Sequence, residues 1–129
     1  MRLLVDTHVL IGLSTGQLQS RHPAIAAGVA GGAHDIAASV VSLWEIAIKT
    51  RLGKLNPGMP LSNLAVFFET AGFSILPINR DHAVAEVWPE PSTRDPFDRL
   101  LLAQCKVEVR LLVSADGALV GHPLVADKL

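Results

Sequence analysis

The chain has 129 residues, half of them hydrophobic, and a formal net charge of −1. That length suits one domain over residues 1–129 with a substantial core, while the charge is not basic enough for binding nucleic acid by non-specific attraction alone. No stretch is apolar for long enough to span a bilayer, and the first apolar run ends at Asp6, too early for a signal peptide. The single cysteine excludes an intramolecular disulfide. We therefore expect a cytoplasmic protein without membrane contact.

Short apolar runs without polar alternation predict buried strands. In chain order they lie at residues 3–5, 36–38, 73–76 and 111–113. Apolar periodicity and Gly or Pro punctuation predict helices between them. These helices are expected at residues 7–13, 23–30, 40–52, 61–71, 81–88 and 96–108. The alternation predicts an α/β, three-layer fold in which helices flank a central, mainly parallel β-sheet.

The stretch TRDPFDRLLLA, residues 93–103, begins the helix at 96–108 and carries two acids. Asp95 followed by proline has the character of an N-cap. Asp98, three positions later, would suit a capping box. However, Asp98 extends the apolar stripe of Leu101 and Leu102, and a capping acid has no need to face the core. We therefore assign the cap to Asp95 and regard Asp98 as a candidate for chemistry.

Two further acids follow predicted strands. Asp6 comes directly after residues 3–5, and Asp116 comes shortly after residues 111–113. Asp6 could instead cap the next helix, and an Asp-Gly pair at 116–117 is an ordinary turn. Open parallel sheets bind ligands beyond the carboxyl ends of their strands. Both carboxylates are therefore expected at the same edge of the sheet.

Glu45 lies in a helix that is apolar almost all round. A pair with Lys49 at i,i+4 is the simplest explanation, but it contributes only ~0.2–0.5 kcal/mol. A buried carboxylate needs a partner. Four acids directed at one cleft would raise each other's pKa unless a cation lay between them. Hard divalent cations prefer such oxygen ligands. A cation bound there can activate a water molecule to attack a phosphodiester.

The chain resembles the PIN-domain ribonucleases, in particular VapC-type toxins of type II toxin–antitoxin systems. Four ordered stretches carry the likeness: LLVDTHVLIGL, SVVSLWEIAIKTRLGKL, RDPFDRLLLAQ and LVSADGAL. The resemblance implies a single PIN domain, Mg²⁺ or Mn²⁺ as cofactor and endonucleolytic cleavage of RNA. It maps the catalytic and metal-binding acids onto Asp6, Glu45, Asp98 and Asp116, with metal contact chiefly from Asp6 and Asp98. It also implies a homodimer and a cognate VapB-type antitoxin.

Two other functions remain open from the sequence. A phosphatase with Asp6 as covalent nucleophile would often carry a second Asp where this chain has His8. A catalytically inactive PIN-like module that binds RNA or protein would be favoured by the loss of an acid, and none of the four is lost. His8 is expected as a packing or rim residue rather than as a ligand.

Several other side chains near these acids have open roles. The hydroxyls of Thr7 and Ser114 could orient a water or make local turn bonds. Cys105 is expected in the core. Phosphate contacts are possible for the cations nearest the proposed cleft in sequence, for which exposure to solvent is the simpler role. These cations are Lys49, Arg51, Arg94 and Arg99.

Overall fold

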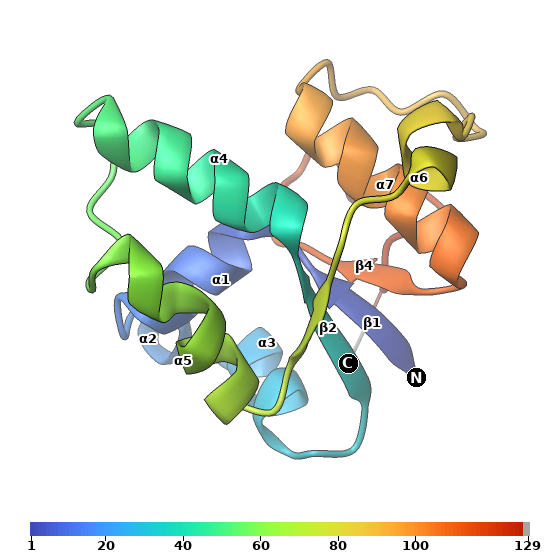
Figure 1. The fold of residues 1–129 in the computed structure, drawn as a ribbon. Helices are drawn as coiled ribbons and strands as arrows, with labels where there is room; N and C mark the ends of the chain where they lie inside the picture. The colour runs from blue at the N-terminus through green and yellow to red at the C-terminus, as the bar shows by residue number, and fades with distance from the viewer. Residues whose placement is uncertain (128–129) are drawn as a thin grey trace.

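The computed structural model describes residues 1–127, and Figure 1 shows its fold. Its sheet has the strand order β3-β2-β1-β4, and every neighbouring pair is parallel. The strands are β1 (Arg2–Val5), β2 (Asp35–Ser39), β3 (Ser74–Leu76) and β4 (Leu111–Val113). The predicted α/β fold is thus confirmed, with an all-parallel sheet among the strands described.

The helices connect consecutive strands and cover both faces of the sheet (Figure 1). Those between β1 and β2 are α1 (Thr7–Ser14), α2 (Leu18–Arg21) and α3 (Pro23–Ala30). Between β2 and β3 lie α4 (Val40–Arg51), the 3₁₀ helix η1 (Leu61–Asn63) and α5 (Leu64–Thr70). Between β3 and β4 lie α6 (Arg80–Val84) and α7 (Pro96–Glu108).

Strand β1 shows how the sheet separates two cores. Leu3 and Val5 pack into a cluster formed with α1, α2, α3 and α5. Leu4, whose side chain points to the opposite face, packs into a second cluster beneath α7. Because both faces are covered, β1 is apolar over Leu3–Val5 on both faces, as buried parallel strands are. The arrangement has three layers: helices, sheet and helices.

Helix α4 lies across the carboxyl end of the sheet. Ser39, the last residue of β2, caps it by accepting a hydrogen bond from the Val41 amide at 3.0 Å. Val41 packs into the core beneath α7, whereas Ile46 packs into the opposite core. The helix therefore spans the edge at which the strands end, and it carries Glu45 to that edge.

Two sequence predictions need correction, and one short helix is absent from the prediction. The helix expected at residues 61–71 divides into η1 and α5. The helix expected at 81–88 is wrong beyond Val84, because Ala85 already has an extended backbone with ψ 133°. The four-residue helix α2 was not predicted, since one turn is too short for apolar periodicity to show. No helix within residues 1–127 is long and apolar enough to cross a bilayer.

Candidate active site

Asp6 and Asp116 lie beyond the ends of neighbouring strands β1 and β4, and Ser114 joins them. The Ser114 hydroxyl donates a hydrogen bond to Asp6 Oδ2. The same hydroxyl oxygen accepts one from the Asp116 backbone amide at 3.0 Å. Residues more than a hundred positions apart therefore meet at one edge of the sheet, as the order of the strands predicted.

Asp6 is 1% exposed and also caps α1, where its Oδ1 accepts a hydrogen bond from the Val9 amide at 2.9 Å. Burial raises the pKa of Asp6, and the nearby Asp116 carboxylate raises it further. The hydrogen bonds from Ser114 and Val9 oppose that rise. The two roles considered for Asp6, helix cap and candidate ligand, are therefore compatible in this geometry.

Glu45 has the partners that its burial requires. Its Oε1 accepts a hydrogen bond from Thr7 Oγ1 at 2.7 Å, and its Oε2 lies 2.5 Å from Lys49 Nζ. Thr7 Oγ1 is also 2.9 Å from Ser42 Oγ. The hydrogen bond to Glu45 raises the pKa of Lys49. The Thr7 hydroxyl thus links α1 to α4 instead of forming only a local turn bond.

Asp98 lies in the first turn of α7 and is 8% exposed. Burial first, and then the neighbouring Asp95 carboxylate, raises its pKa to about 6, with smaller contributions from Glu45 and Asp116. Its Oδ2 accepts a hydrogen bond from Thr93 Oγ1 at 3.3 Å. Asp95 forms the predicted cap, accepting from the Phe97 amide at 2.9 Å. Asp95 therefore caps α7 as predicted, whereas the chemical role of Asp98 stays a prediction.

The four candidate acids form a chain of electrostatic neighbours. Asp116 raises the pKa of both Asp6 and Asp98, and Glu45 raises that of Asp98. Like charges held in a partly buried region favour the protonated form unless a cation joins them. The structure thus brings all four acids to the same end of the sheet.

The donor set fits a hard divalent cation that keeps part of its water shell. Within residues 1–127, no three His, Cys, Asp or Glu side chains are grouped closely enough to hold a metal ion by themselves. Mg²⁺ commonly takes one or two carboxylates and completes its shell with water. Asp98 Oδ1 and Asp116 Oδ2 accept no hydrogen bond from the described part of the chain. These two oxygens are therefore free to act as ligands.

A family model for the PIN domain matches residues 3–120. The chain belongs to the PIN-domain family. No curated protein matches it. PIN domains are generally nucleases, so membership supports a hydrolase that acts on nucleic acid, within a superfamily that typically uses divalent metal ions.

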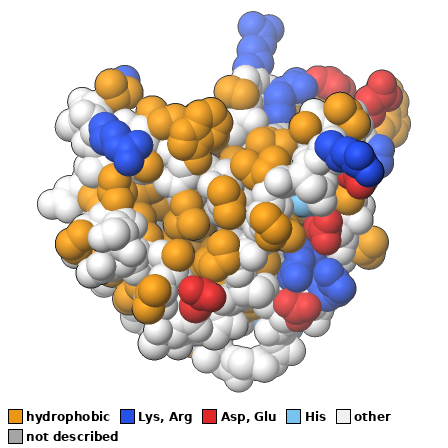
Figure 2. Space-filling view, viewed as in Figure 1, with side chains coloured by type: hydrophobic (Ala, Val, Ile, Leu, Met, Phe, Trp, Pro, Cys, Tyr) orange, Lys and Arg blue, Asp and Glu red, His pale blue; other side chains and the backbone are white. Residues whose placement is uncertain are grey.

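Of the cations near the acids of this PIN domain, Lys49, Arg51 and Arg94 take the simpler roles expected from the sequence, whereas Arg99 binds within the protein. Lys49 pairs with Glu45, and Arg99 binds the Thr93 carbonyl oxygen and the Glu90 carboxylate at 2.9 and 2.5 Å. Arg51 and Arg94 are exposed. Figure 2 shows that on the face in view Lys and Arg side chains are scattered and form no single basic patch. On that face, nucleic acid would therefore be held by individual cations and not by a basic patch.

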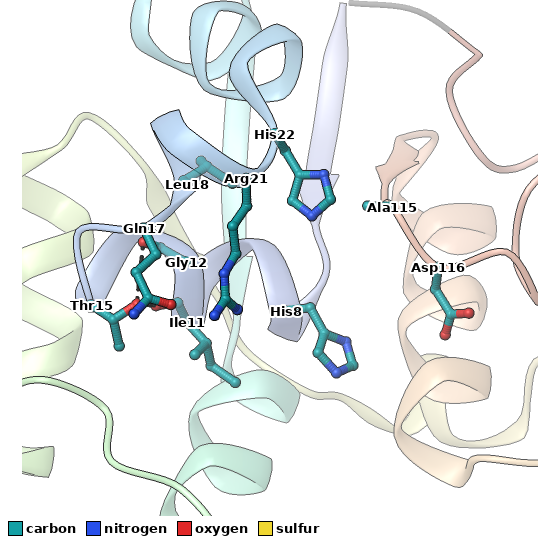
Figure 3. A pocket seen from close by; sticks show the side chains of 10 residues that line it. All are labelled: His8, Ile11, Gly12, Thr15, Gln17, Leu18, Arg21, His22, Ala115 and Asp116. Carbon is teal, nitrogen blue, oxygen red and sulfur yellow. Dashed lines mark hydrogen bonds between the residues drawn. The ribbon is translucent and has the colours of Figure 1, made fainter.

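A hollow of about 450 Å³ opens beside Asp116, between α1, α2 and the loop after β4. His8, Arg21 and His22 line it, and Figure 3 shows the Arg21 guanidinium extending from α2 along α1. His8 is exposed there, so of its two expected roles it takes that of a rim residue. Sequence reasoning missed Arg21 and His22 because the short helix α2, which ends at Arg21, was itself missed. The sequence offers one signal: Pro23 is typical of the first residue of a helix, so Arg21 and His22 are expected in a turn just before it.

Proposed function

We propose that this PIN domain is a Mg²⁺- or Mn²⁺-dependent endoribonuclease that hydrolyses RNA phosphodiester bonds. The observation that supports this most directly is that Asp6, Glu45, Asp98 and Asp116 lie near one another at the carboxyl end of the sheet, with Ser114 joining Asp6 to Asp116. Family membership supports the nuclease class. RNA as the substrate rests on the resemblance of the four acidic stretches to VapC-type ribonucleases.

Asp6 and Asp98 are the main proposed metal ligands, with Glu45 and Asp116 contributing directly or through water. A bound divalent ion would supply activation of the attacking water, orientation of the phosphate and neutralisation of developing charge. The chain's own part is to hold the carboxylates in place. Hydrogen bonds from Ser114 and the Val9 amide fix both oxygens of Asp6. In this mechanism water attacks phosphorus in line, the P–O bond to the opposite sugar oxygen breaks, and that oxygen leaves with a proton taken from water. No covalent bond forms between protein and RNA.

The proposed biological role is the toxin of a type II toxin–antitoxin pair, acting in the cytoplasm as a homodimer. A cognate VapB-type antitoxin would neutralise it by covering the acidic site. This role rests on the resemblance, as does the proposal that residues 1–129 form one PIN domain. The alternative, a catalytically inactive module that binds RNA or protein, has the same fold and would differ only in cleavage.

Cleavage of labelled single-stranded RNA by the purified protein tests the activity. We expect cutting with Mg²⁺ or Mn²⁺, none with EDTA, and none from Asp6→Asn or Asp98→Asn, each of which removes a proposed ligand. Glu69→Gln is the matched control, because this exposed acid on α5 lies outside the site. A purified Asp6→Asn or Asp98→Asn protein that cuts at nearly the wild-type rate would refute the assignment.

A second experiment addresses the toxin role. Induced expression of the wild type is expected to stop growth and to leave new RNA ends at defined sites, whereas Asp98→Asn leaves neither. Sequencing those ends also identifies the RNA target. Growth that continues unchanged, with no new ends while the purified protein cuts RNA, would contradict the toxin role and leave the nuclease assignment standing.

A further inference from the structure

The hollow beside Asp116 continues directly from the proposed active site. Asp116 and Ala115, from the loop after β4, form one wall, and His8 of α1 lies two residues after Asp6. Helix α2 and the residues around it form the opposite wall, with Arg21 at the end of the helix (Figure 3). An RNA strand that presents one phosphate to the acids would therefore bring an adjacent nucleotide to this hollow.

Arg21 lines the hollow and, unlike Lys49 and Arg99, has no ion-pair partner within residues 1–127. Lys49 and Arg99 each bind a carboxylate, whereas Arg51 and Arg94 are exposed and do not line the hollow. Within residues 1–127 the Arg21 guanidinium makes no side-chain hydrogen bond or ion pair, although it lines a hollow next to candidate catalytic acids. An arginine fork presents several N–H donors in the geometry that phosphate oxygens accept. Its position is therefore suited to a phosphate.

The rest of the hollow suits one nucleotide rather than a free anion. Leu18 is buried beneath the floor, and Ile11 is half-buried beside it, so the hollow has an apolar surface against which a base can pack. His8, His22 and Gln17 add exposed polar groups around the opening. An apolar floor with polar groups at the rim is the usual composition of a small-ligand site.

We propose that this hollow binds the RNA nucleotide next to the scissile bond, with Arg21 contacting its phosphate and the half-buried Ile11 contacting its base. The inference deepens the proposed ribonuclease function and rests on it for the identity of the strand. It accounts for how a chain of net charge −1 holds a polyanion beside a group of acids. Arg21 serves here as a binding and positioning residue.

Binding is measured first, without cleavage, by fluorescence anisotropy of a fluorescein-labelled, mixed-sequence single-stranded RNA in EDTA. We expect Arg21→Gln to weaken binding about tenfold and to reduce the slope of log K against log[salt] by about 0.7. Arg21→Lys should recover part of the loss. Arg80→Gln is the control, because it removes the same charge from an exposed arginine on α6, away from the hollow.

A position-specific test then uses the cleavage site found by sequencing the RNA ends. Substrates carry one neutral methylphosphonate, placed in turn at each phosphate flanking the scissile bond. One of these positions is expected to raise KM for the wild type several-fold and to have little further effect on Arg21→Gln, because the variant has already lost that contact. A generally damaged protein would not show this loss of sensitivity at a single phosphate.

The outcomes separate this inference from the proposed function. If the wild type cuts RNA but Arg21→Gln binds and cuts like Arg80→Gln, the hollow is not the nucleotide site while the nuclease stands. If RNA binds in an Arg21-dependent manner but no metal produces cleavage, the site stands and the nuclease proposal fails. Absence of RNA binding by the wild type overturns the inference, as does equal sensitivity of both proteins to every methylphosphonate.

Discussion

Replacing Asp98 by Asn is expected to stabilise the metal-free protein while abolishing RNA cleavage. Asn has the shape of a protonated aspartic acid, and its amide oxygen can still accept the hydrogen bond from Thr93. The substitution removes a negative charge that is buried beside Asp95 and faces Glu45 and Asp116. A residue selected for stability alone would not show this opposition between folding and activity.

The size of the effect follows from the pKa of Asp98. Its rise from 3.8 to about 6 makes ionisation about 3 kcal/mol more costly in the folded protein than in the unfolded chain. Solvent at the mouth of the site screens part of this cost, so we expect Asp98→Asn to raise the free energy of unfolding by about 1–2 kcal/mol at neutral pH.

The sign of the pH dependence is fixed by linkage. Between pH 3.8 and about 6 the folded wild type binds more protons than the unfolded chain, so this group makes the wild type less stable as pH rises through that window. Below the window Asp98 is protonated in both states, and the variant has no advantage. The difference between variant and wild type should therefore be near zero in acid, grow through the window and level off above it.

Urea unfolding in EDTA at a series of pH values measures this difference, with Glu69→Gln as the control whose difference stays near zero and flat. Added Mg²⁺ should stabilise the wild type more than Asp98→Asn, because the variant lacks a proposed ligand. The reasoning would be refuted by a variant that is less stable than wild type at neutral pH, or by a difference that does not change with pH. Either result would show that the ionised Asp98 carboxylate does not destabilise the fold.

The remaining predictions concern the helix cap and a close backbone contact. Asp95→Ala should be about 1 kcal/mol less stable than Asp95→Asn, because only Asn retains the cap on the Phe97 amide, and equal urea midpoints would exclude the capping role. Gly58→Ala should lower the free energy of unfolding by about 2–4 kcal/mol. The added Cβ would lie 2.5 Å from the Ser14 carbonyl oxygen, and the residue has a φ of +83°. Gly53→Ala, with φ +73° and open space around it, should lower the free energy of unfolding by only about 1 kcal/mol. Equal decreases in the two variants, measured by thermal unfolding, would contradict the close contact at Gly58.

Local signals explain why much of the fold could be predicted from the sequence. Helix α7 begins and ends at the predicted residues because Asp95 and the following proline define its start and the apolar stripe its face. Cys105 is buried as predicted, and its burial raises its pKa to about 12. The strand ends placed Asp6 and Asp116 at one edge, since the carboxyl ends of parallel strands share an edge.

The features that could not be predicted depend on contacts between distant segments or on very short elements. Nothing local to Ser114 indicates that its hydroxyl bonds Asp6, because that contact exists only once β1 and β4 pair. Arg99 was placed among candidate phosphate contacts, yet the loop before α7 folds back so that its guanidinium binds Glu90. The place of Arg21 beside the acids could not be predicted because helix α2 is a single turn.

The hydrogen bonds of the candidate acids suggest why hydroxyl residues recur around them. Asp6 accepts from Ser114, Glu45 from Thr7, and Asp98 from Thr93. A hydroxyl is a neutral donor, so it orients a buried carboxylate and partly offsets the cost of burial without cancelling its charge. Arginine or lysine partners at every acid would stabilise the fold more strongly, but they would also occupy the place of a cation. The site instead keeps its carboxylates oriented and mostly unneutralised, which is the condition that binding a divalent ion requires.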